Sequence, residues 1–222
     1  MFRWKLISKN FIHILPNLEI KDREKFIISK CSGKRVLNLG AIDFYENQIC
    51  GLHKKLMAVS KDVIGIDIDE KGIKIAEKAG FKNIYYGDVE NLNKTYFDFK
   101  YDFDVIIAGE IIEHLSNPGR FLEGIKQFLG KSEMIITTPN ALNLHHFIFA
   151  LIGIEYIHPD HVQIYSYHTL RRLLENHNFK VKNVYYYILS ERERTLSNII
   201  FKIFPKLATG LIFVVTYDSI KR

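Results

Sequence analysis

Short runs of β-branched and other apolar residues alternate along the chain with longer segments in which apolar residues recur at helical spacing. The runs predict seven strands, at residues 35–39, 62–66, 83–86, 103–107, 133–138, 181–189 and 211–217. Strands that alternate with helices are typical of a doubly wound, mostly parallel α/β sheet. The last two strands lack an obvious crossover helix between them, so we expect an antiparallel end to the sheet around an insertion at 190–210.

Polar residues and glycines mark where three of the helices begin and end. Asp69 is a predicted N-cap of a helix that ends at Gly80, and Asn117 precedes a Pro at the start of a second helix that ends at Gly130. Ser166 is predicted to begin a third helix.

Composition narrows the class of protein. The chain has 222 residues, of which 47% are hydrophobic, so it is not a disordered chain and has room for one domain with additions. Its two cysteines exclude a disulfide scaffold or a Cys-based zinc module. No apolar run approaches the ~20 residues of a spanning helix, and no signal sequence is evident. We therefore expect a cytoplasmic protein.

Charge divides the chain into three blocks. Residues 1–40 carry nine basic and three acidic side chains, residues 41–170 carry twelve and eighteen, and residues 171–222 carry ten and four. An acidic centre between basic ends argues against a general nucleic-acid coat. We expect a basic helical extension at 1–33, followed by a domain at 34–222 that contains a lid-like segment at 140–165.

Carboxylates follow the first four predicted strands, as Asp43, Asp67, Asp88 and Glu110. Ligands of open α/β sheets bind beyond the carboxyl ends of the strands, so these four would meet at one edge. They would repel a pyrophosphate, and the first turn has a single glycine where a dinucleotide fingerprint needs three, which disfavours NAD and FAD. S-adenosylmethionine fits better, because it offers a sulfonium cation, a ribose diol for Asp67 and an adenine amine for Asp88.

Five motifs in order carry a family resemblance: VLNLGAIDFYEN, VIGIDIDEKGI, YYGDVENL, FDVIIAGEIIEHLSNPGRFLEGI and IITTPNALNL. Over residues 34–190 the chain resembles class I S-adenosylmethionine-dependent methyltransferases. The resemblance implies a seven-stranded sheet with an antiparallel last strand. It also implies cofactor contacts at Gly40, Ala41, Asp67, Ile68, Asp88, Val89 and Ala108. The first motif departs from the family at Asn38, Ile42 and Phe44, where an acid and two glycines are usual, and this keeps a non-catalytic scaffold open as an alternative.

A second group of side chains is Glu110, Glu113, His114 and His161. If a helical turn begins after Glu110, the first three face one way. Two carboxylates and two imidazoles could hold Mg, Mn, Fe or Zn. Without a metal, His114 or His161 could act as a general base.

The same run, followed by GIEYIHPDHV, resembles two groups of methyltransferases. One group comprises the quinone-biosynthesis O-methyltransferases, and the other the small-RNA 3′-terminal 2′-O-methyltransferases, which hold a divalent ion with Glu-x-x-Glu-His and a later His. Both groups methylate a hydroxyl. The resemblance therefore implies O-methylation of a small acceptor (a quinone precursor, a sugar or a lipid-linked molecule), with terminal 2′-O-methylation of RNA as the alternative.

Apolar residues recur at helical spacing near Trp4–Leu15 and near Leu196–Leu207, beside basic residues. Each segment is expected to pack on the core or close the pocket. The alternative is peripheral attachment to an anionic membrane, which would deliver a lipid-linked acceptor. Nucleic acid is a less favoured partner, because no recognition module is present.

Overall fold

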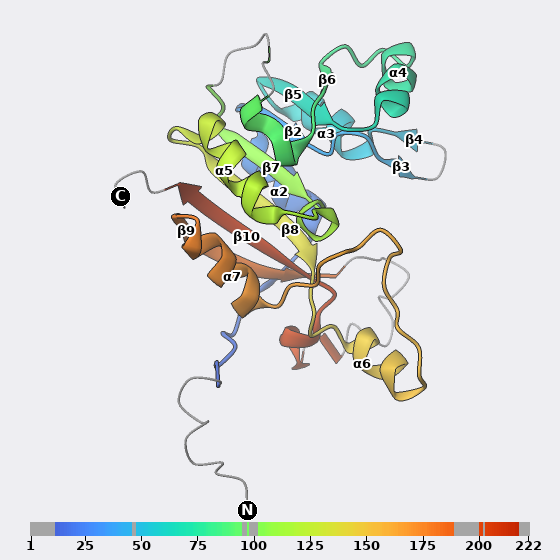
Figure 1. Ribbon diagram of the computed structural model, residues 1–222, viewed down its shortest axis with the longest axis vertical. Coiled ribbons are helices and arrows are strands. Elements are labelled where there is room, and N and C mark those ends of the chain that lie inside the picture. Colours follow the sequence, from blue (N-terminus) through green and yellow to red (C-terminus); the bar gives the residue numbers. More distant parts are fainter. Residues whose placement is uncertain are drawn as a thin grey trace, which may run out of the picture.

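One sheet of eight strands forms the centre of the domain (Figure 1). The structure is a computed structural model that describes residues 12–45, 48–94, 97, 102–188, 200–201 and 203–217. The strand order is β1-β9-β10-β8-β7-β2-β5-β6. In chain order the strands are β1 (Ile20–Lys21), β2 (Arg35–Leu39), β5 (Asp62–Asp67), β6 (Ile84–Tyr86), β7 (Val105–Gly109), β8 (Glu133–Pro139), β9 (Phe179–Tyr187) and β10 (Gly210–Tyr217).

The direction of the strands confirms the predicted fold class. β2 pairs in parallel with β5 and β7, β5 with β6, and β7 with β8. β10 runs antiparallel to both of its neighbours, β8 and β9. The seven predicted strands are therefore all present, in a doubly wound sheet with an antiparallel end.

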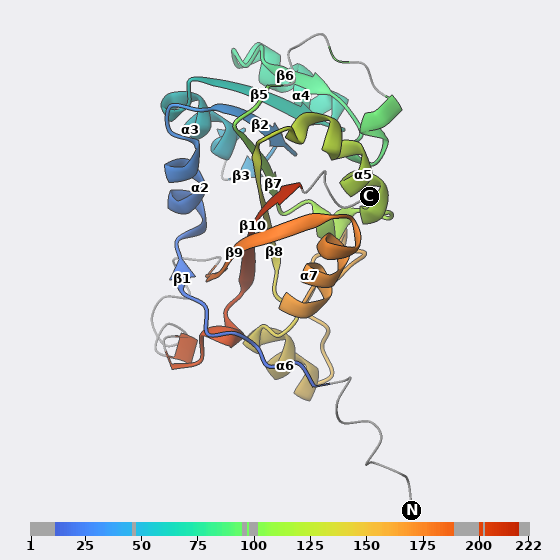
Figure 2. The same cartoon turned by 90° about the vertical axis from the view of Figure 1, so that its left-hand side faces the viewer.

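Helices cover both faces of this sheet (Figure 2). α2 (Arg23–Cys31) and α3 (Gly51–Val59) lie on one face, and α5 (Pro118–Leu129) and α7 (Tyr167–Asn176) on the other. Alternation along β7 fits this layering, since Val105 and Ile107 belong to the cluster with α2, whereas Ile106 packs with α5 and α7.

The predicted helix starts are correct. The side chain of Asp69 accepts a hydrogen bond from the Lys71 amide at the start of α4 (Glu70–Lys78). Asn117 caps α5 in the same way, and Ser166 caps α7 with a reciprocal bond to Thr169. Each cap satisfies a backbone N–H that has no partner within its helix.

The N-terminal part differs from the expected helical extension at 1–33. Residues 12–19 contain no helix, and the rest of the amphipathic segment, including Trp4, lies outside the described residues. β1 pairs in parallel with β9 as an eighth strand, and α2 buries Ile27 and Cys31 in the core. Residues 20–31 are therefore part of the sheet domain, because β1 extends the sheet and the side chains of Ile27 and Cys31 pack in its core. A short hairpin of β3 (Phe44–Tyr45) and β4 (Gln48–Ile49), which precedes helix α3, was also not predicted.

The lid-like segment 140–165 contains helix α6 (Leu144–Leu151), which projects beyond the end of the sheet (Figure 1). The Asn140 side-chain amide donates to the carbonyls of Lys206 at 3.0 Å and Ala208 at 2.9 Å, and so joins the lid to η5 (Pro205–Leu207). Of the insertion, residues 200, 201 and 203 are helical, whereas Leu196 lies outside the described residues. Within the described part of the chain, no helix has the length and apolar character needed to cross a bilayer.

Candidate active site

The loop after β2 begins at an exposed glycine. Gly40 has a φ of +63°, and a Cβ there would lie 3.0 Å from Cδ1 of Ile111, so both conformation and space favour glycine. The next residue, Ala41, is buried. The Gly40 backbone is thus open at the sheet edge where a ligand would approach.

Asp67 ends β5 beside this loop. Its carboxylate accepts hydrogen bonds from the Ile42 amide at 2.8 Å and from the Asp69 amide at 2.9 Å. Burial to 8% exposure raises its pKa, while these two hydrogen bonds act in the opposite direction. Each oxygen keeps a lone pair that could accept from a diol. The neighbouring Ile68 is 62% exposed and offers an apolar surface beside it.

The two residues that replace the family's glycines have side chains in different surroundings, and the backbone amide of Ile42 donates to Asp67. Ile42 packs against α4, where a Cβ on Gly72 would come within 2.6 Å of its Cγ2 atom. Phe44 lies in the β3–β4 hairpin and is largely exposed. The absence of a side chain at Gly72 therefore accommodates the larger residue at position 42.

The other predicted cofactor residues fall into two groups. Asp88 and Val89 begin η2 (Val89–Lys94), where Asp88 accepts from the Glu90 amide at 2.8 Å and from the Asn91 side chain at 2.6 Å. Asp88 is therefore a cap that remains partly exposed at the sheet edge. Ala108, in contrast, is fully buried in β7, so its side chain lies in the core and not on the surface of the site.

The two other predicted carboxylates accept hydrogen bonds from other residues of the chain. Asp43 accepts from the amides of Gly51 and Leu52 at the start of α3. Glu110 follows β7 with a φ of +54°. Its Oε1 atom accepts from the Tyr187 hydroxyl at 2.6 Å and from the Thr137 hydroxyl at 2.9 Å. The predicted helical turn begins only at η3 (Ile112–His114), so Glu110 does not share a helical face with Glu113 and His114.

Glu113 is a buried carboxyl group. It is 1% exposed, and neither of its side-chain oxygens has a hydrogen-bond partner among the described residues. Burial and the nearby charge of Glu110 raise its pKa to about 8. Its backbone carbonyl accepts from the amides of Val162 and Gln163, both at 3.0 Å, which attaches the end of the lid-like segment to η3.

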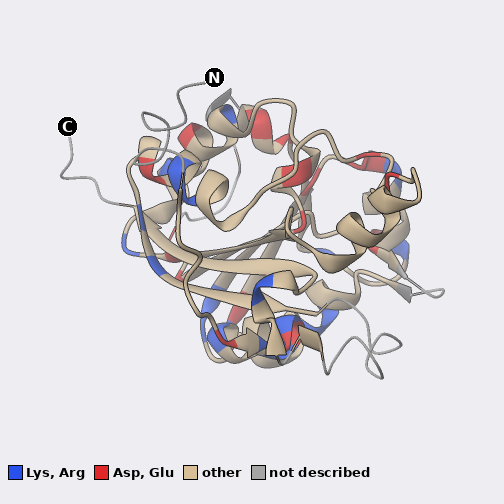
Figure 3. Ribbon diagram, turned by 90° about the horizontal axis from the view of Figure 1, so that it is seen from below, with Lys and Arg blue, Asp and Glu red and all other residues tan. Residues whose placement is uncertain are grey.

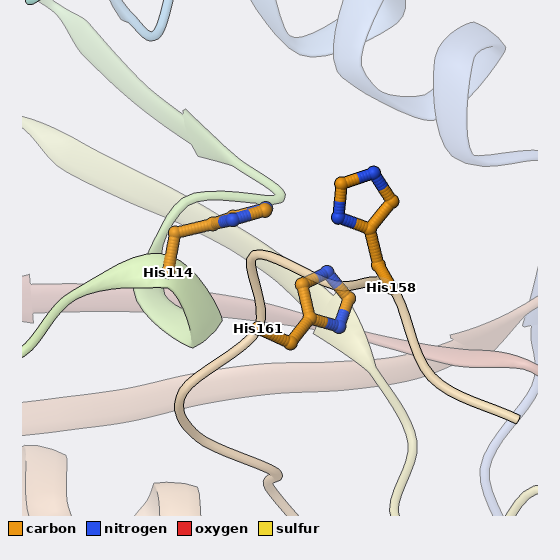
Figure 4. Close-up of side chains that lie close together, drawn as sticks. All are labelled: His114, His158 and His161. Atoms are coloured by element: carbon orange, nitrogen blue, oxygen red, sulfur yellow. The ribbon is translucent and has the colours of Figure 1, made fainter. Parts of the chain in front are cut away.

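Three imidazoles meet where this segment contacts η3 (Figure 4). His114, His158 and His161 each offer a ligand atom, and these atoms all lie within 4.8 Å of one another. The predicted pair, His114 and His161, has ring centroids 4.6 Å apart. Glu110 and Glu113 are not part of this group. His158 was not predicted, although its spacing from His161 in the sequence His-Pro-Asp-His was a signal for a turn that brings two rings together.

A sequence profile described as "Methyltransferase domain" matches residues 29–184 of this chain. The chain belongs to this methyltransferase family. The resemblance to methyltransferases that the sequence motifs indicated is thereby confirmed.

Two curated relatives are named ubiquinone biosynthesis O-methyltransferase. The one from Pelagibacter ubique is 28% identical over 131 residues, which are 58% of this chain and 53% of the relative. The one from Paraburkholderia phymatum is 26% identical over 156 residues, or 64% and 63% of the two chains. The methyltransferase therefore spans about half to two thirds of the length of these relatives.

Solved structures share the fold at low identity. A methyltransferase described as SAM-dependent, from Archaeoglobus fulgidus, has a TM-score of 0.60 at 21% identity and covers 87% of this chain and 90% of its own. The small RNA methyltransferase HEN1 has a TM-score of 0.61 at 14% identity, over 94% of this chain and 27% of its own. These likenesses confirm the fold and leave the acceptor open.

Proposed function

We propose that this methyltransferase transfers a methyl group to a hydroxyl of a small acceptor of the quinone-precursor type. The observation that carries the proposal is the contact between the rings of His114 and His161. His114 comes after β7, at the same edge of the sheet where Asp67 ends β5. The printed names of the curated relatives, which join O-methylation to quinone biosynthesis, support the same acceptor class.

The cofactor side of the site fits S-adenosylmethionine. An open backbone at Gly40, a carboxylate with free lone pairs at Asp67 and an exposed apolar surface at Ile68 match an amino acid, a ribose diol and an adenine ring. When bound, the cofactor supplies an electrophilic methyl group on a sulfonium sulfur. The residues of the chain would orient it and leave the acceptor to approach from the lid side.

The acceptor side holds imidazoles suited to removing a proton from a hydroxyl. Burial lowers the pKa of His161, and the neighbouring His114 and His158 lower it further, which favours a neutral ring at pH 7. Nδ1 of His114 lies 3.2 Å from the carbonyl oxygen of Asp160. Because a carbonyl can only accept, Nδ1 donates, and Nε2 of the neutral ring keeps its lone pair. Either ring could then act as the general base.

A divalent metal is a further part of the proposal. The imidazoles of His114 and His161 have the chemistry of a metal site, whereas the Glu113 carboxyl lies outside the group of ligand atoms. A bound ion would polarise the acceptor hydroxyl and lower its pKa. Of the four ligands expected from the sequence, His114 and His161 lie together, whereas Glu110 is held by Tyr187 and Thr137.

Calorimetric titration with S-adenosylhomocysteine tests the cofactor site. We expect Asp67→Asn to weaken binding about ten- to a hundredfold, since hydrogen bonds to a charged group contribute ~1.5–3 kcal/mol. Asp62→Asn is the matched control, because Asp62 lies exposed at the other end of the same strand. Absence of binding by the unaltered protein would instead favour a non-catalytic scaffold.

Transfer of a labelled methyl group separates the acceptor classes. We expect catechol-type acceptors to be methylated and short RNA neither to be methylated nor to compete. A steep decrease of activity with salt and competition by RNA would favour terminal 2′-O-methylation of RNA.

We also propose that the apolar surface of the lid-like segment contacts a membrane and receives a lipid-linked acceptor. α6 has no buried residue and no charged one (Figure 3). Phe147 and Leu151 are 64% and 71% exposed. A cavity of about 480 Å³ adjoins α6 and is lined by Ala141, His146, Ala150, Gly153, Ile154, Glu155, Tyr156, Ile157 and Ile164. Exposed apolar side chains grouped on one helix are typical of an interaction site.

A further inference from the structure

We propose that His158 completes a three-imidazole site with His114 and His161, and that this site binds a zinc-like transition metal ion in preference to Mg²⁺. The inference concerns the acceptor side of the proposed methyltransferase site and rests on that function only for the role of the ion. Binding of the ion rests on the side chains alone.

The three rings come from two segments that the backbone holds together. His114 ends η3, whereas His158 and His161 lie in the lid-like segment (Figure 4). The His161 amide donates to the His158 carbonyl at 3.1 Å, which closes a turn that brings both rings to one side. The hydrogen bonds of Val162 and Gln163 to the Glu113 carbonyl then attach this turn next to His114. These backbone hydrogen bonds therefore hold the three rings near one another.

The distances suit one ion. His158 and His161 have ring centroids 5.2 Å apart, and His114 and His158 5.8 Å. The ligand atoms of all three lie within 4.8 Å of one another. Tetrahedral zinc with Zn–N distances of about 2.0–2.1 Å needs ligand atoms about 3.4 Å apart, so small rotations of the rings would close the site.

The surroundings of the rings favour metal binding. His114 donates through Nδ1 to the Asp160 carbonyl, the outer hydrogen bond that metal-bound histidines usually make. Nδ1 of His158 accepts from the Asp160 amide at 3.3 Å, a long bond that competes weakly with an ion. The carboxylate of Asp160 lies 3.8 Å from the same Nδ1 and adds a favourable negative charge.

Three nitrogen ligands determine which ion is favoured. Imidazole suits zinc, copper, iron and nickel, whereas magnesium takes oxygen ligands and retains its water. Three imidazoles also leave one tetrahedral position open, as in catalytic zinc sites. A hydroxyl of the acceptor could occupy that open position.

Binding of Co²⁺ to the chelator-treated protein tests the inference without an activity assay. Co²⁺ is a spectroscopic substitute for Zn²⁺, and an intense visible band reports a four-coordinate site. We expect the unaltered protein to show this band, and His158→Ala to weaken Co²⁺ and Zn²⁺ binding by at least about tenfold, since even outer partners of a metal site change affinity that much. We expect millimolar Mg²⁺ to leave the band unchanged.

His177→Ala is the matched control, because this imidazole lies at the end of α7 against Glu123 and outside the cluster. His158 is more than half exposed, so its removal should leave the fold intact, and binding of S-adenosylhomocysteine checks this separately. Equal Co²⁺ affinity in His158→Ala and the unaltered protein would overturn the inference. So would the absence of binding, or displacement of Co²⁺ by Mg²⁺. If the unaltered protein binds Co²⁺ but does not bind S-adenosylhomocysteine, the result counts against the proposed function and not against the metal site.

Discussion

Glu110 accepts a hydrogen bond of 2.6 Å from the hydroxyl of Tyr187, a residue 77 positions later in the chain. The Thr137 hydroxyl donates to the same oxygen, and Arg23 lies 3.9 Å from it. Glu110 thus joins three strands and α2 at the edge of the sheet. This contact also turns the carboxylate toward Tyr187, whose ring occupies the space that a side chain at Gly210 would need.

Tyr187→Phe should destabilise the protein. The substitution removes a donor to a charged acceptor inside a fully buried position, so we expect the free energy of unfolding to decrease by about 1.5–3 kcal/mol. Urea denaturation measures this. Tyr185→Phe is the control, since Tyr185 is only partly buried on the same strand, and equal effects of the two substitutions would contradict the role given to the hydrogen bond.

Glu113 should make stability depend on pH. Its folded pKa of about 8 lies above the ordinary value of 4.5, because burial and Glu110 disfavour the charge. Between these two values the unfolded chain binds fewer protons than the folded one, so stability decreases as pH rises through this range. Glu113→Gln removes the titration. We expect the variant to gain stability relative to the unaltered protein between pH 5 and pH 8, by on the order of a few kcal/mol.

Denaturation of Glu113→Gln and of the unaltered protein at pH 5 and at pH 8 measures the difference. A chelator is present in every sample, so that a bound metal does not contribute. Glu133→Gln is a suitable control, because Glu133 is a partly exposed carboxylate at the start of β8. A stability difference between Glu113→Gln and the unaltered protein that is the same at both pH values would contradict the raised pKa.

Local signals made the fold predictable, and contacts distant in sequence limited the prediction of the site. The caps Asp69, Asn117 and Ser166 act within a few residues, so the sequence alone located three helix starts. β1 has two residues, too few to show a periodicity. The backbone of Glu110 is left-handed where a long-range contact with Tyr187 holds its side chain, which no helical spacing could indicate.

Ile42→Gly, which restores the glycine usual in the family, should affect stability more than cofactor binding. The Ile42 side chain packs against Gly72 of α4, and its backbone amide still donates to Asp67 in the variant. We expect the free energy of unfolding to decrease by about 1–3 kcal/mol and the affinity for S-adenosylhomocysteine to change less than about tenfold. Phe44→Ala, at an exposed position, is the control. An affinity that increases by more than this would mean that Ile42 obstructs the cofactor.

Charged residues on α6 should prevent attachment to membranes. Phe147 and Leu151 are four positions apart on an exposed helix, so both could insert into one lipid surface. Burying one such side chain contributes ~1.5–3 kcal/mol, and we expect Leu151→Glu to weaken co-sedimentation with anionic vesicles by about tenfold or more. Ile75→Glu, on the exposed side of α4, controls for added charge on an apolar surface residue elsewhere. If the unaltered protein does not sediment with anionic vesicles, or if both variants lose binding equally, α6 is not the contact and the acceptor reaches the site from solution.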